Sequence, residues 1–236
     1  MYSWRARIGM IIPSTNAVAE PQVQMMSPDG VVFHTTRLAF AGTNEENVRR
    51  FVGQAGDAAK LLADAGVDMV VFACTAASMF RPGIDAEIVE LMEDACGVRS
   101  TTVSRAVVAA LRALDARRVV ITSPYMTNER ETNFLEHHQV SVLGDVGLKL
   151  APPEFPKVEP GRWYRQVRDQ AEPDADAYFL SCTAVRTAEV IAPLERDLGK
   201  PVVTSNQAMV WHCLNELGVH AAPSGYGRLF DTLGSA

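Results

Sequence analysis

The tripeptide Cys-Thr-Ala occurs twice in the sequence, at residues 74–76 and 182–184. Each copy follows a short apolar run that is typical of a buried strand, so Cys74 and Cys182 should both stand at strand ends. A free thiol has a pKa of about 8.5 and serves as an acid, as a base or, once ionised, as a nucleophile. Because each copy is expected to lead into a helix, whose N-terminal N–H groups favour a thiolate, we expect both thiols to be reactive.

Two thiols that face each other across a cleft could act on opposite faces of one small carbon acid. One could remove a proton while the other returns one, or one thiolate could add to an activated double bond and later leave. Hydroxyl, amide and backbone N–H groups nearby could hold carboxylate oxygens and stabilise an enediolate. This chemistry needs no metal and no organic cofactor, and we predict none.

Polar turns at other strand ends supply further candidates, because ligands of open parallel sheets bind beyond the carboxyl ends of the strands. Two predicted strands end in such turns, Pro-Ser-Thr-Asn at 13–16 and Pro-Tyr-Met-Thr-Asn at 124–128. The candidate substrate-binding residues in these turns and after the cysteines are Ser14, Asn16, Thr75, Tyr125, Thr183 and Arg186. Cys96 and Cys213 lie outside the repeated tripeptide, and we expect both to be structural.

The elements that must position these residues alternate along the whole chain. Short β-branched runs predict strands at 8–12, 31–36, 67–73, 98–102, 119–123, 146–150, 177–181 and 201–204. Amphipathic stretches predict helices at 43–65, 85–95, 104–114, 128–138, 162–170, 188–198 and 206–217. Thr43 and Glu46 have the spacing of a capping box, and 151–161 is expected to be a Pro-rich loop. This alternation predicts the α/β class, with parallel sheets covered by helices.

The alternation restarts half way along the chain. Residues 7–13 resemble 118–124, residues 67–76 resemble 175–184, and residues 97–106 resemble 199–208. Three matching blocks in the same order indicate an internal duplication. We therefore predict a first α/β half at 1–103 and a second at 104–217, related by a pseudo-twofold axis, with the active site in the cleft between them. The C-terminal segment 218–236 is expected to pack on the first half.

Composition excludes several classes of partner. The chain has 236 residues, of which 47% are hydrophobic, and a net charge of −6 without a basic stripe. It therefore lacks the clustered cations that bind nucleic acid or a membrane surface, and no apolar run is long enough for a transmembrane helix. We expect a cytoplasmic protein with four free cysteines, and a homo-oligomer that binds a small-molecule carboxylate.

The chain resembles the maleate cis–trans isomerase family in the segments 12–16, 73–75, 122–126 and 181–183 and in Glu20. That family belongs to the aspartate/glutamate racemase superfamily, which also includes arylmalonate decarboxylase and hydantoin racemase. The resemblance implies two similar α/β domains with the site between them. It also implies that Cys74 adds to maleate, that the bond rotates and that elimination gives fumarate. In this scheme Cys182 handles the proton or steadies the intermediate, while Asn16 and Tyr125 bind carboxylate.

One departure from the family concerns the substrate. The isomerases present another Asn from the loop after the second strand of the second half, and here 151–161 contains none. Arg186 instead offers a cation that could meet a carboxylate. The alternatives to a dicarboxylate isomerase are a two-thiol racemase or decarboxylase of a related carbon acid, and a non-catalytic small-molecule binding protein.

Overall fold

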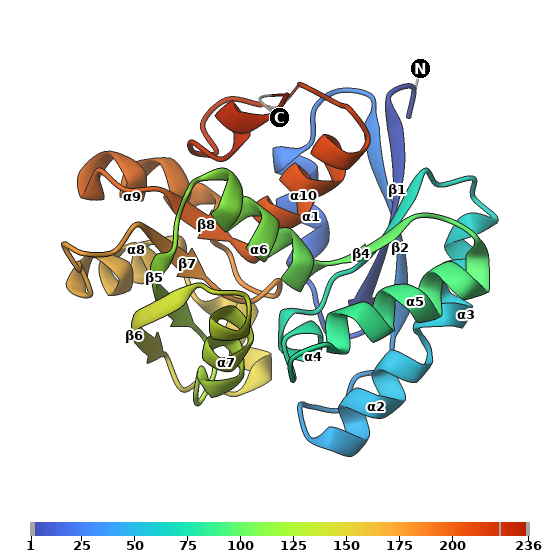
Figure 1. Cartoon of the computed structure of the whole chain (residues 1–236), viewed down its shortest axis with the longest axis horizontal. Helices are drawn as coiled ribbons and strands as arrows, with labels where there is room; N and C mark the ends of the chain where they lie inside the picture. Colours follow the sequence, from blue (N-terminus) through green and yellow to red (C-terminus); the bar gives the residue numbers. More distant parts are fainter. Residues whose placement is uncertain (1–2, 222, 235–236) are drawn as a thin grey trace.

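Two four-stranded parallel sheets, one from each half of the chain, form the framework of the molecule (Figure 1). The computed structural model describes residues 3–221 and 223–234. The strands are β1 (Ala6–Pro13), β2 (Val31–Leu38), β3 (Met69–Phe72), β4 (Ser100–Thr102), β5 (Arg118–Ser123), β6 (Ser141–Gly147), β7 (Ala177–Leu180) and β8 (Val202–Thr204). The strand order is β2-β1-β3-β4 in the first sheet and β6-β5-β7-β8 in the second, so the prediction of two similar α/β halves is confirmed.

Helices cover both sheets. They are α1 (Ala19–Met26), α2 (Glu45–Gly53), α3 (Ala55–Ala63), α4 (Thr75–Ser78), α5 (Ile84–Cys96), α6 (Val103–Ala113), α7 (Glu129–His137), α8 (Pro160–Asp169), α9 (Ile191–Leu198) and α10 (Ser205–Glu216). Short 3₁₀ turns are η1 (Pro152–Lys157), η2 (Ala188–Val190) and η3 (Phe230–Thr232). The sequence did not lead us to expect α1 or α4, the second of which directly follows Cys74.

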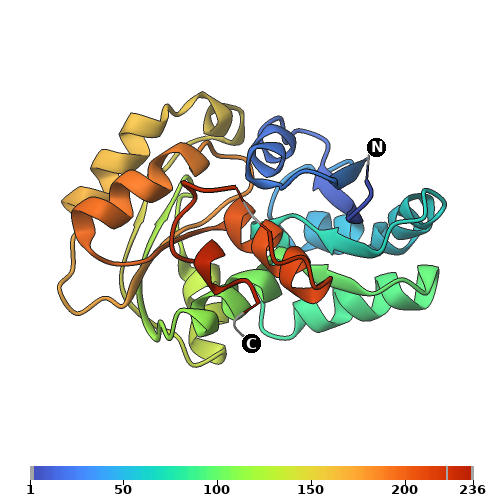
Figure 2. The same ribbon diagram turned by 90° about the horizontal axis from the view of Figure 1, so that it is seen from above.

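Helices α6 and α10 occupy the centre of the molecule, between the two sheets, in both ribbon views (Figure 2). They begin in the same way, because Thr102 and Thr204 each accept a hydrogen bond from the backbone N–H three residues later. Such caps satisfy N–H groups that a helix start leaves unpaired. The two helices pack on each other, and α10 is buried on nearly all sides. The boundary at 103/104 therefore stays a prediction, since the halves share this central pair.

Two predicted elements were wrong in their boundaries. The helix expected at 43–65 is broken at Gln54 into α2 and α3, and its cap is Asn44, not Thr43, because the Asn44 side chain accepts from the N–H of Asn47. The strand expected at 146–150 lies earlier, as β6. Its place is taken by a turn whose N–H groups, at 148–150, donate to carbonyls of residues 123–125, with Lys149 at a φ of 54°.

The segment expected to be a Pro-rich loop, 151–161, contains η1 and the first residues of α8. Pro160 stands in the first turn of α8, where the missing N–H of proline costs nothing because that N–H would have no partner in the helix. The proline-rich composition therefore led us to predict a loop at a place where a helix begins.

The described part of the C-terminal segment, 218–221 and 223–234, packs on the second half, not on the first as expected; residues 222, 235 and 236 lie outside the described residues. The Arg228 N–H donates to Glu195 of α9, and the carbonyl of Tyr226 accepts from Gln207 of α10. Trp211 of α10 donates to Thr232. The reason is that α9 and α10 offer buried polar partners to this segment.

Within the described residues, no helix has the length and apolar character needed to cross a membrane.

Candidate functional site

Cys74 stands at the turn from β3 into α4, as the N-cap residue of that helix. The preceding strand is apolar and fully buried, which fixes the position of the thiol at the carboxyl end of the first sheet. The side chain is 4% exposed. Burial raises the pKa of the Cys74 thiol to about 12, although a hydrogen bond from the N–H of Ala77 favours the thiolate.

Cys182 follows β7 at the equivalent place in the second sheet, and its backbone is strained. Its φ is 117°, a region that residues with a Cβ rarely adopt. The backbone N–H donates to the Ser205 hydroxyl over 3.0 Å, and the sulfur accepts from the N–H of Ala184 over 3.3 Å. Burial raises the pKa of the thiol to about 11, and the hydrogen bond from the Tyr125 hydroxyl opposes that shift.

The two thiols and the Tyr125 phenol belong to one electrostatic cluster. A charge on Cys182 raises the pKa of Cys74, and charges on both cysteines raise the pKa of Tyr125, which burial has already raised. The equivalent strand ends of the two halves therefore bring the thiols within reach of one another. Burial therefore favours the protonated form of both thiols, contrary to the expected thiolate character. Helix α4 has only four residues, and no helix directly follows Cys182, so burial outweighs the helix N-terminus.

Hydroxyl and amide groups join the two halves around the cysteines. The side-chain oxygen of Asn16 accepts from the N–H groups of Val18 and Ala19, just before and at the start of α1, and its NH₂ donates to the Thr183 hydroxyl over 3.0 Å. Thr183 in turn donates to the carbonyl of Ala73 over 3.2 Å. Thr75 donates to Ser205 over 3.0 Å, and all of these side chains are buried. Four of the predicted site residues, Asn16, Thr75, Tyr125 and Thr183, thus lie in the same region as the two thiols.

Thr183→Val should destabilise the fold by about 1–3 kcal/mol, because it leaves Asn16 and a buried carbonyl without their partner. Thr187→Val is a matched control in the same segment, since the buried Thr187 hydroxyl has no hydrogen-bond partner among the described residues. That control should be neutral or stabilising. Urea unfolding of both variants measures the difference. Equal losses would show that the hydrogen bonds of Thr183 contribute nothing to stability.

Two predicted site residues lie away from this region. Ser14 is exposed, and its hydrogen bonds to other described residues are made by its backbone, to Leu38 and from Arg37. Arg186 is also exposed, with its guanidinium 3.9 Å from the Glu189 carboxylate. The expectation that Arg186 binds substrate is therefore not supported by its position. An arginine in the loop after Cys182 can reach solvent and an acidic neighbour without the cost of burial.

Three residues of the site were not found in the sequence. Ser205 and Asn206 begin α10, where Ser205 binds Thr75 and Cys182 and the Asn206 side chain donates to the carbonyl of Thr183. Glu131 lies in the first turn of α7, is 3% exposed, and raises the pKa values of Cys74 and Cys182. Glu131 lies three residues after Asn128, and this spacing is also that of a helix cap. In the structure Asn128 makes no cap, since its amide binds Ser123 and Asp145.

Tyr125 is held from two sides. Its ring packs edge-on against Phe155 of η1, with 5.9 Å between the ring centres. On the other side Gly147 closely approaches its backbone, so that a Cβ at Gly147 would lie 2.2 Å from the carbonyl oxygen of Tyr125. Because Gly147, at the end of β6, has no side chain, the Tyr125 turn can lie directly against it.

Gly147→Ala should destabilise the protein by about 1–3 kcal/mol and lower kcat, because the new methyl group displaces the Tyr125 turn. Gly144→Ala, in the same strand, adds its methyl group to open space and should change neither property. Thermal unfolding and steady-state kinetics of the two variants test this. A Gly147→Ala enzyme with wild-type kcat would mean that the turn tolerates the shift.

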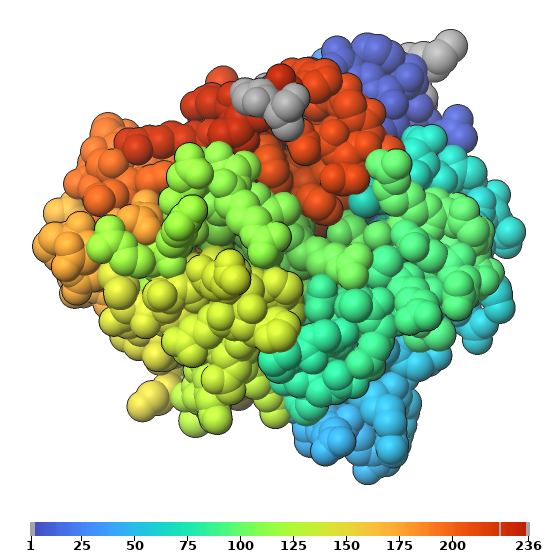
Figure 3. Space-filling view, viewed as in Figure 1, coloured from blue at the N-terminus to red at the C-terminus, as the bar shows by residue number. Residues whose placement is uncertain are grey.

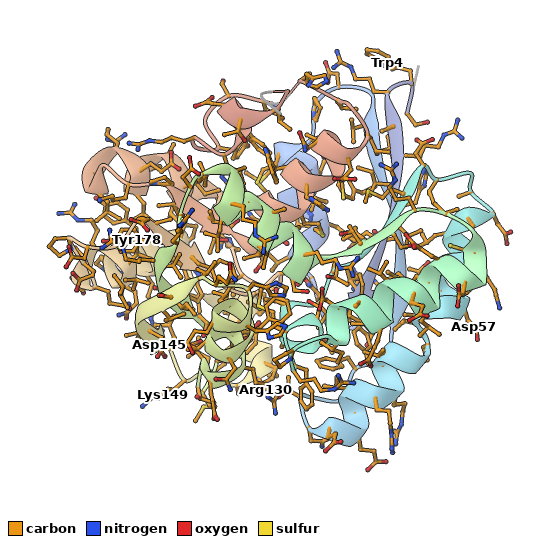
Figure 4. The ribbon with its side chains drawn as sticks, viewed as in Figure 1. Trp4, Asp57, Arg130, Asp145, Lys149 and Tyr178 are labelled. Carbon is orange, nitrogen blue, oxygen red and sulfur yellow. The ribbon has the colours of Figure 1, made fainter. Side chains whose placement is uncertain are left out.

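The side of the site formed by α7 and α4 is closed by contact between the halves. Arg130 of α7 donates to the carbonyl of Thr43 over 2.7 Å, and its guanidinium lies 4.2 Å from the centre of the Phe80 ring. Figure 4 shows Arg130 at the edge of α7 that faces α4. In the space-filling view the surfaces around α7 and α4 lie against each other (Figure 3).

The described residues contain no group of His, Cys, Asp and Glu that could hold a metal ion.

Sequence comparison finds relatives along nearly the whole chain. A family model for arylmalonate decarboxylase matches residues 8–230. The arylmalonate decarboxylase of Bordetella bronchiseptica is 32% identical over 231 residues, which cover 95% of this chain and 96% of that protein. The maleate isomerase of Nocardia farcinica is 27% identical over 239 residues, which cover 94% of each. The relatives thus catalyse two different reactions.

Solved structures agree with the sequence comparison. A liganded arylmalonate decarboxylase mutant, with one glycine changed to cysteine and one cysteine changed to serine, superposes with a TM-score of 0.89 at 32% identity, over 96% of this chain and 99% of that chain. The maleate isomerase of Pseudomonas putida S16 superposes with a TM-score of 0.87 at 25% identity, over 98% and 99% of the two chains. Both have the fold of this chain.

Proposed function

The chain belongs to the arylmalonate decarboxylase family, and we propose that it is a cofactor-independent cis–trans isomerase that converts maleate, or a closely similar dicarboxylate, to its trans isomer. The observation that carries this proposal is the pair of buried thiols at equivalent strand ends, with Tyr125 bound to one of them. Maleate isomerases among the relatives support it. Because its four cysteines are free, we also infer a reducing, cytoplasmic location.

The two thiols have different roles in this reaction. The sulfur of Cys74 forms a bond to one alkene carbon, and the electron pair of the double bond moves onto the neighbouring carbon and its carboxylate as an enediolate. Cys74 loses its proton to water as its sulfur attacks, and Cys182 donates its own proton to that carbon and remains as a thiolate. After rotation about the new single bond, the Cys182 thiolate takes a proton back from the same carbon, the Cys74 sulfur leaves as a thiolate, and Cys74 regains a proton from water. Protons and electrons are therefore conserved over the cycle.

The environment of the thiols fits these roles. Cys182 receives a hydrogen bond from Tyr125, which favours the thiolate that remains after it has given its proton. Cys74 has no such side-chain partner, so its sulfur is the stronger nucleophile once its proton has gone. Asn16 has a second N–H beside the one given to Thr183, and this neutral donor can hold a carboxylate oxygen without neutralising a thiolate. The hydroxyls of Thr75 and Thr183 can do the same only by turning away from Ser205 and from the carbonyl of Ala73.

Decarboxylation is the second candidate function. It is favoured by the 32% identity to arylmalonate decarboxylase and by Phe155, an apolar neighbour of Tyr125 in the segment where the isomerases are expected to present an Asn. Here a malonate-type substrate would lose carbon dioxide and leave an enediolate, and Cys182 would protonate it. This reaction needs only one thiol, and it leaves the buried Cys74 unexplained.

An NMR time course in deuterated water separates the candidates. Purified protein is incubated without cofactor with maleate, with an arylmalonate and with single enantiomers of aspartate and glutamate. We expect fumarate signals from maleate alone. Release of carbon dioxide from the malonate would support the decarboxylase, and exchange of the α-hydrogen of an amino acid would support the racemase. Binding without turnover would indicate a binding protein.

A further inference from the structure

The two cysteines stand at equivalent strand ends, but their backbones differ. The repeat matches residues 67–76 with residues 175–184, so that Cys74 and Cys182 are counterparts in the same tripeptide. Cys74 has a φ of −135°, which is ordinary extended backbone, whereas Cys182 has a φ of 117°. Because the tripeptides are identical, the difference must come from residues that contact the two turns.

Ser205 contacts the turn of Cys182 directly. It is the first residue of α10 and is fully buried, and its hydroxyl oxygen accepts from the backbone N–H of Cys182 over 3.0 Å. The same oxygen accepts from the Thr75 hydroxyl over 3.0 Å. A hydroxyl oxygen has two acceptor sites, so both are used. One buried atom therefore connects the turn of Cys182 to the residue that follows Cys74.

The first half has no hydroxyl at the equivalent position. The repeat matches residues 97–106 with residues 199–208, so the counterpart of Ser205 is Val103, the first residue of α6. Val103 is also fully buried, and its helix begins with the same kind of threonine cap. The fold therefore accepts an apolar residue at this helix start, where the side chain offers no acceptor to an N–H. The serine is not needed to begin the helix.

The threonines beside the cysteines depart from the symmetry at the same place. Thr183 donates to the carbonyl of Ala73. Since Thr75 is the counterpart of Thr183 and Ser181 the counterpart of Ala73, exact symmetry would have Thr75 donate to the carbonyl of Ser181. Thr75 donates to the Ser205 hydroxyl instead. Both departures from the repeat, in backbone and in hydrogen bonding, thus involve Ser205.

The position of the Cys182 sulfur depends on this backbone conformation. A change of φ rotates the Cβ and the sulfur about the N–Cα bond. A group that transfers a proton to carbon must lie within hydrogen-bond reach of it, and a displacement of about 1 Å can cost about 100-fold in rate. The strained turn therefore places the thiol where an ordinary extended turn would not.

We propose that Ser205 is the positioning residue that makes the two cysteines unequal. By accepting from the N–H of Cys182 it holds that turn at positive φ and so places the thiol for proton transfer, while Cys74 keeps an ordinary turn. The proposal rests on the proposed function in taking Cys182 as the proton donor, an assignment that the isomerase and the decarboxylase share.

Crystal structures of the wild type and of Ser205→Ala test the conformation without any substrate. Alanine removes one oxygen and adds no bulk, so the Cys182 N–H loses its acceptor and the strain is no longer offset. We expect φ of Cys182 to become negative, as at Cys74. In Ser104→Ala, a matched control that removes a buried hydroxyl bound to Thr102 at the start of α6, it should stay positive. A φ that stays near 117° in Ser205→Ala would overturn the proposal.

Steady-state kinetics test the role in the reaction, with maleate or with an arylmalonate, whichever the wild type converts. We expect kcat of Ser205→Ala to fall by about 10- to 100-fold with KM nearly unchanged, because Ser205 acts through Cys182. Ser205→Thr keeps the acceptor oxygen and should recover most of kcat, and Ser104→Ala should match the wild type. A merely structural role would lower the amount of folded enzyme, which circular dichroism measures, and leave kcat per folded molecule unchanged.

The outcomes separate this proposal from the proposed function. Wild-type kcat in a Ser205→Ala enzyme whose turn has relaxed would overturn the proposal, and so would a higher KM at unchanged kcat. If the wild type converts neither maleate nor an arylmalonate, the proposed function fails. The φ of Cys182 in Ser205→Ala would still decide whether Ser205 holds the turn.

Discussion

Cys74→Ala should reduce kcat for the confirmed substrate by about 10⁴-fold or more, with a folded protein and a measurable ligand affinity. The residue supplies the bond to the substrate in the proposed reaction, and the Thr75 hydroxyl beside it is a much weaker nucleophile than a thiolate. What remains after its loss is the binding and electrostatic stabilisation given by the neutral donors. Steady-state kinetics on purified protein, with circular dichroism as the check on folding, measure the effect.

Two cysteines outside the site serve as controls for this result. Cys96 is partly exposed at the end of α5, and Cys213 is fully buried inside α10. Cys96→Ala and Cys213→Ala should keep kcat close to wild type. The second should cost about 1–2 kcal/mol of stability through the cavity that it leaves. If Cys96→Ala were as damaging as Cys74→Ala with folding unchanged, the assignment of the cysteines would be wrong.

The fold could be predicted because its signals are local and repeated. Apolar runs such as 67–73 mark strands buried on both faces, and three matching blocks mark the duplication. The edge strand β6 was misplaced because an edge strand is buried less regularly, as its burial pattern shows. Helix α1 was missed because no side chain caps it: its N-cap residue is Val18, and Asn16, which accepts from the N–H groups of Val18 and Ala19, was interpreted as a turn and site residue.

The site could be predicted only in the parts that the repeat marks. Cys74, Cys182 and the threonines beside them are repeated, and Tyr125 follows a strand that is equivalent to the first one. Glu131 has no counterpart and sits at a spacing typical of helix caps. Whether Glu131 belongs to the site depends on its burial and on the groups around it, and only the tertiary structure shows these. The ionisation of the thiols was misjudged for the same reason, because burial cannot be measured from a strand-end position alone.

The backbone at Cys182 is strained, and such strain is common at functional sites. A φ of 117° is easy for glycine and costly for any residue with a Cβ, and such strain is retained where the side chain is needed. The hydrogen bonds from its N–H to Ser205 and from Ala184 to its sulfur hold the strained turn in place. The sequence gives no sign of this conformation, since glycine is the residue that usually marks it.

Replacing Cys182 by glycine and by alanine separates this strain from the chemistry. Both variants should lose about 10³-fold or more in kcat, because neither can protonate the enediolate. Cys182→Gly should nevertheless be more stable than Cys182→Ala by about 1 kcal/mol or more, since only glycine relaxes the backbone. Urea unfolding and kinetics of the two variants make the comparison. Equal stabilities would show that the turn carries no strain, and wild-type turnover in either variant would remove Cys182 from the reaction. If both variants lose activity and Cys182→Gly is more stable than Cys182→Ala, the strained turn lowers the stability of the fold. The protein then keeps this turn because the reaction needs the thiol of Cys182.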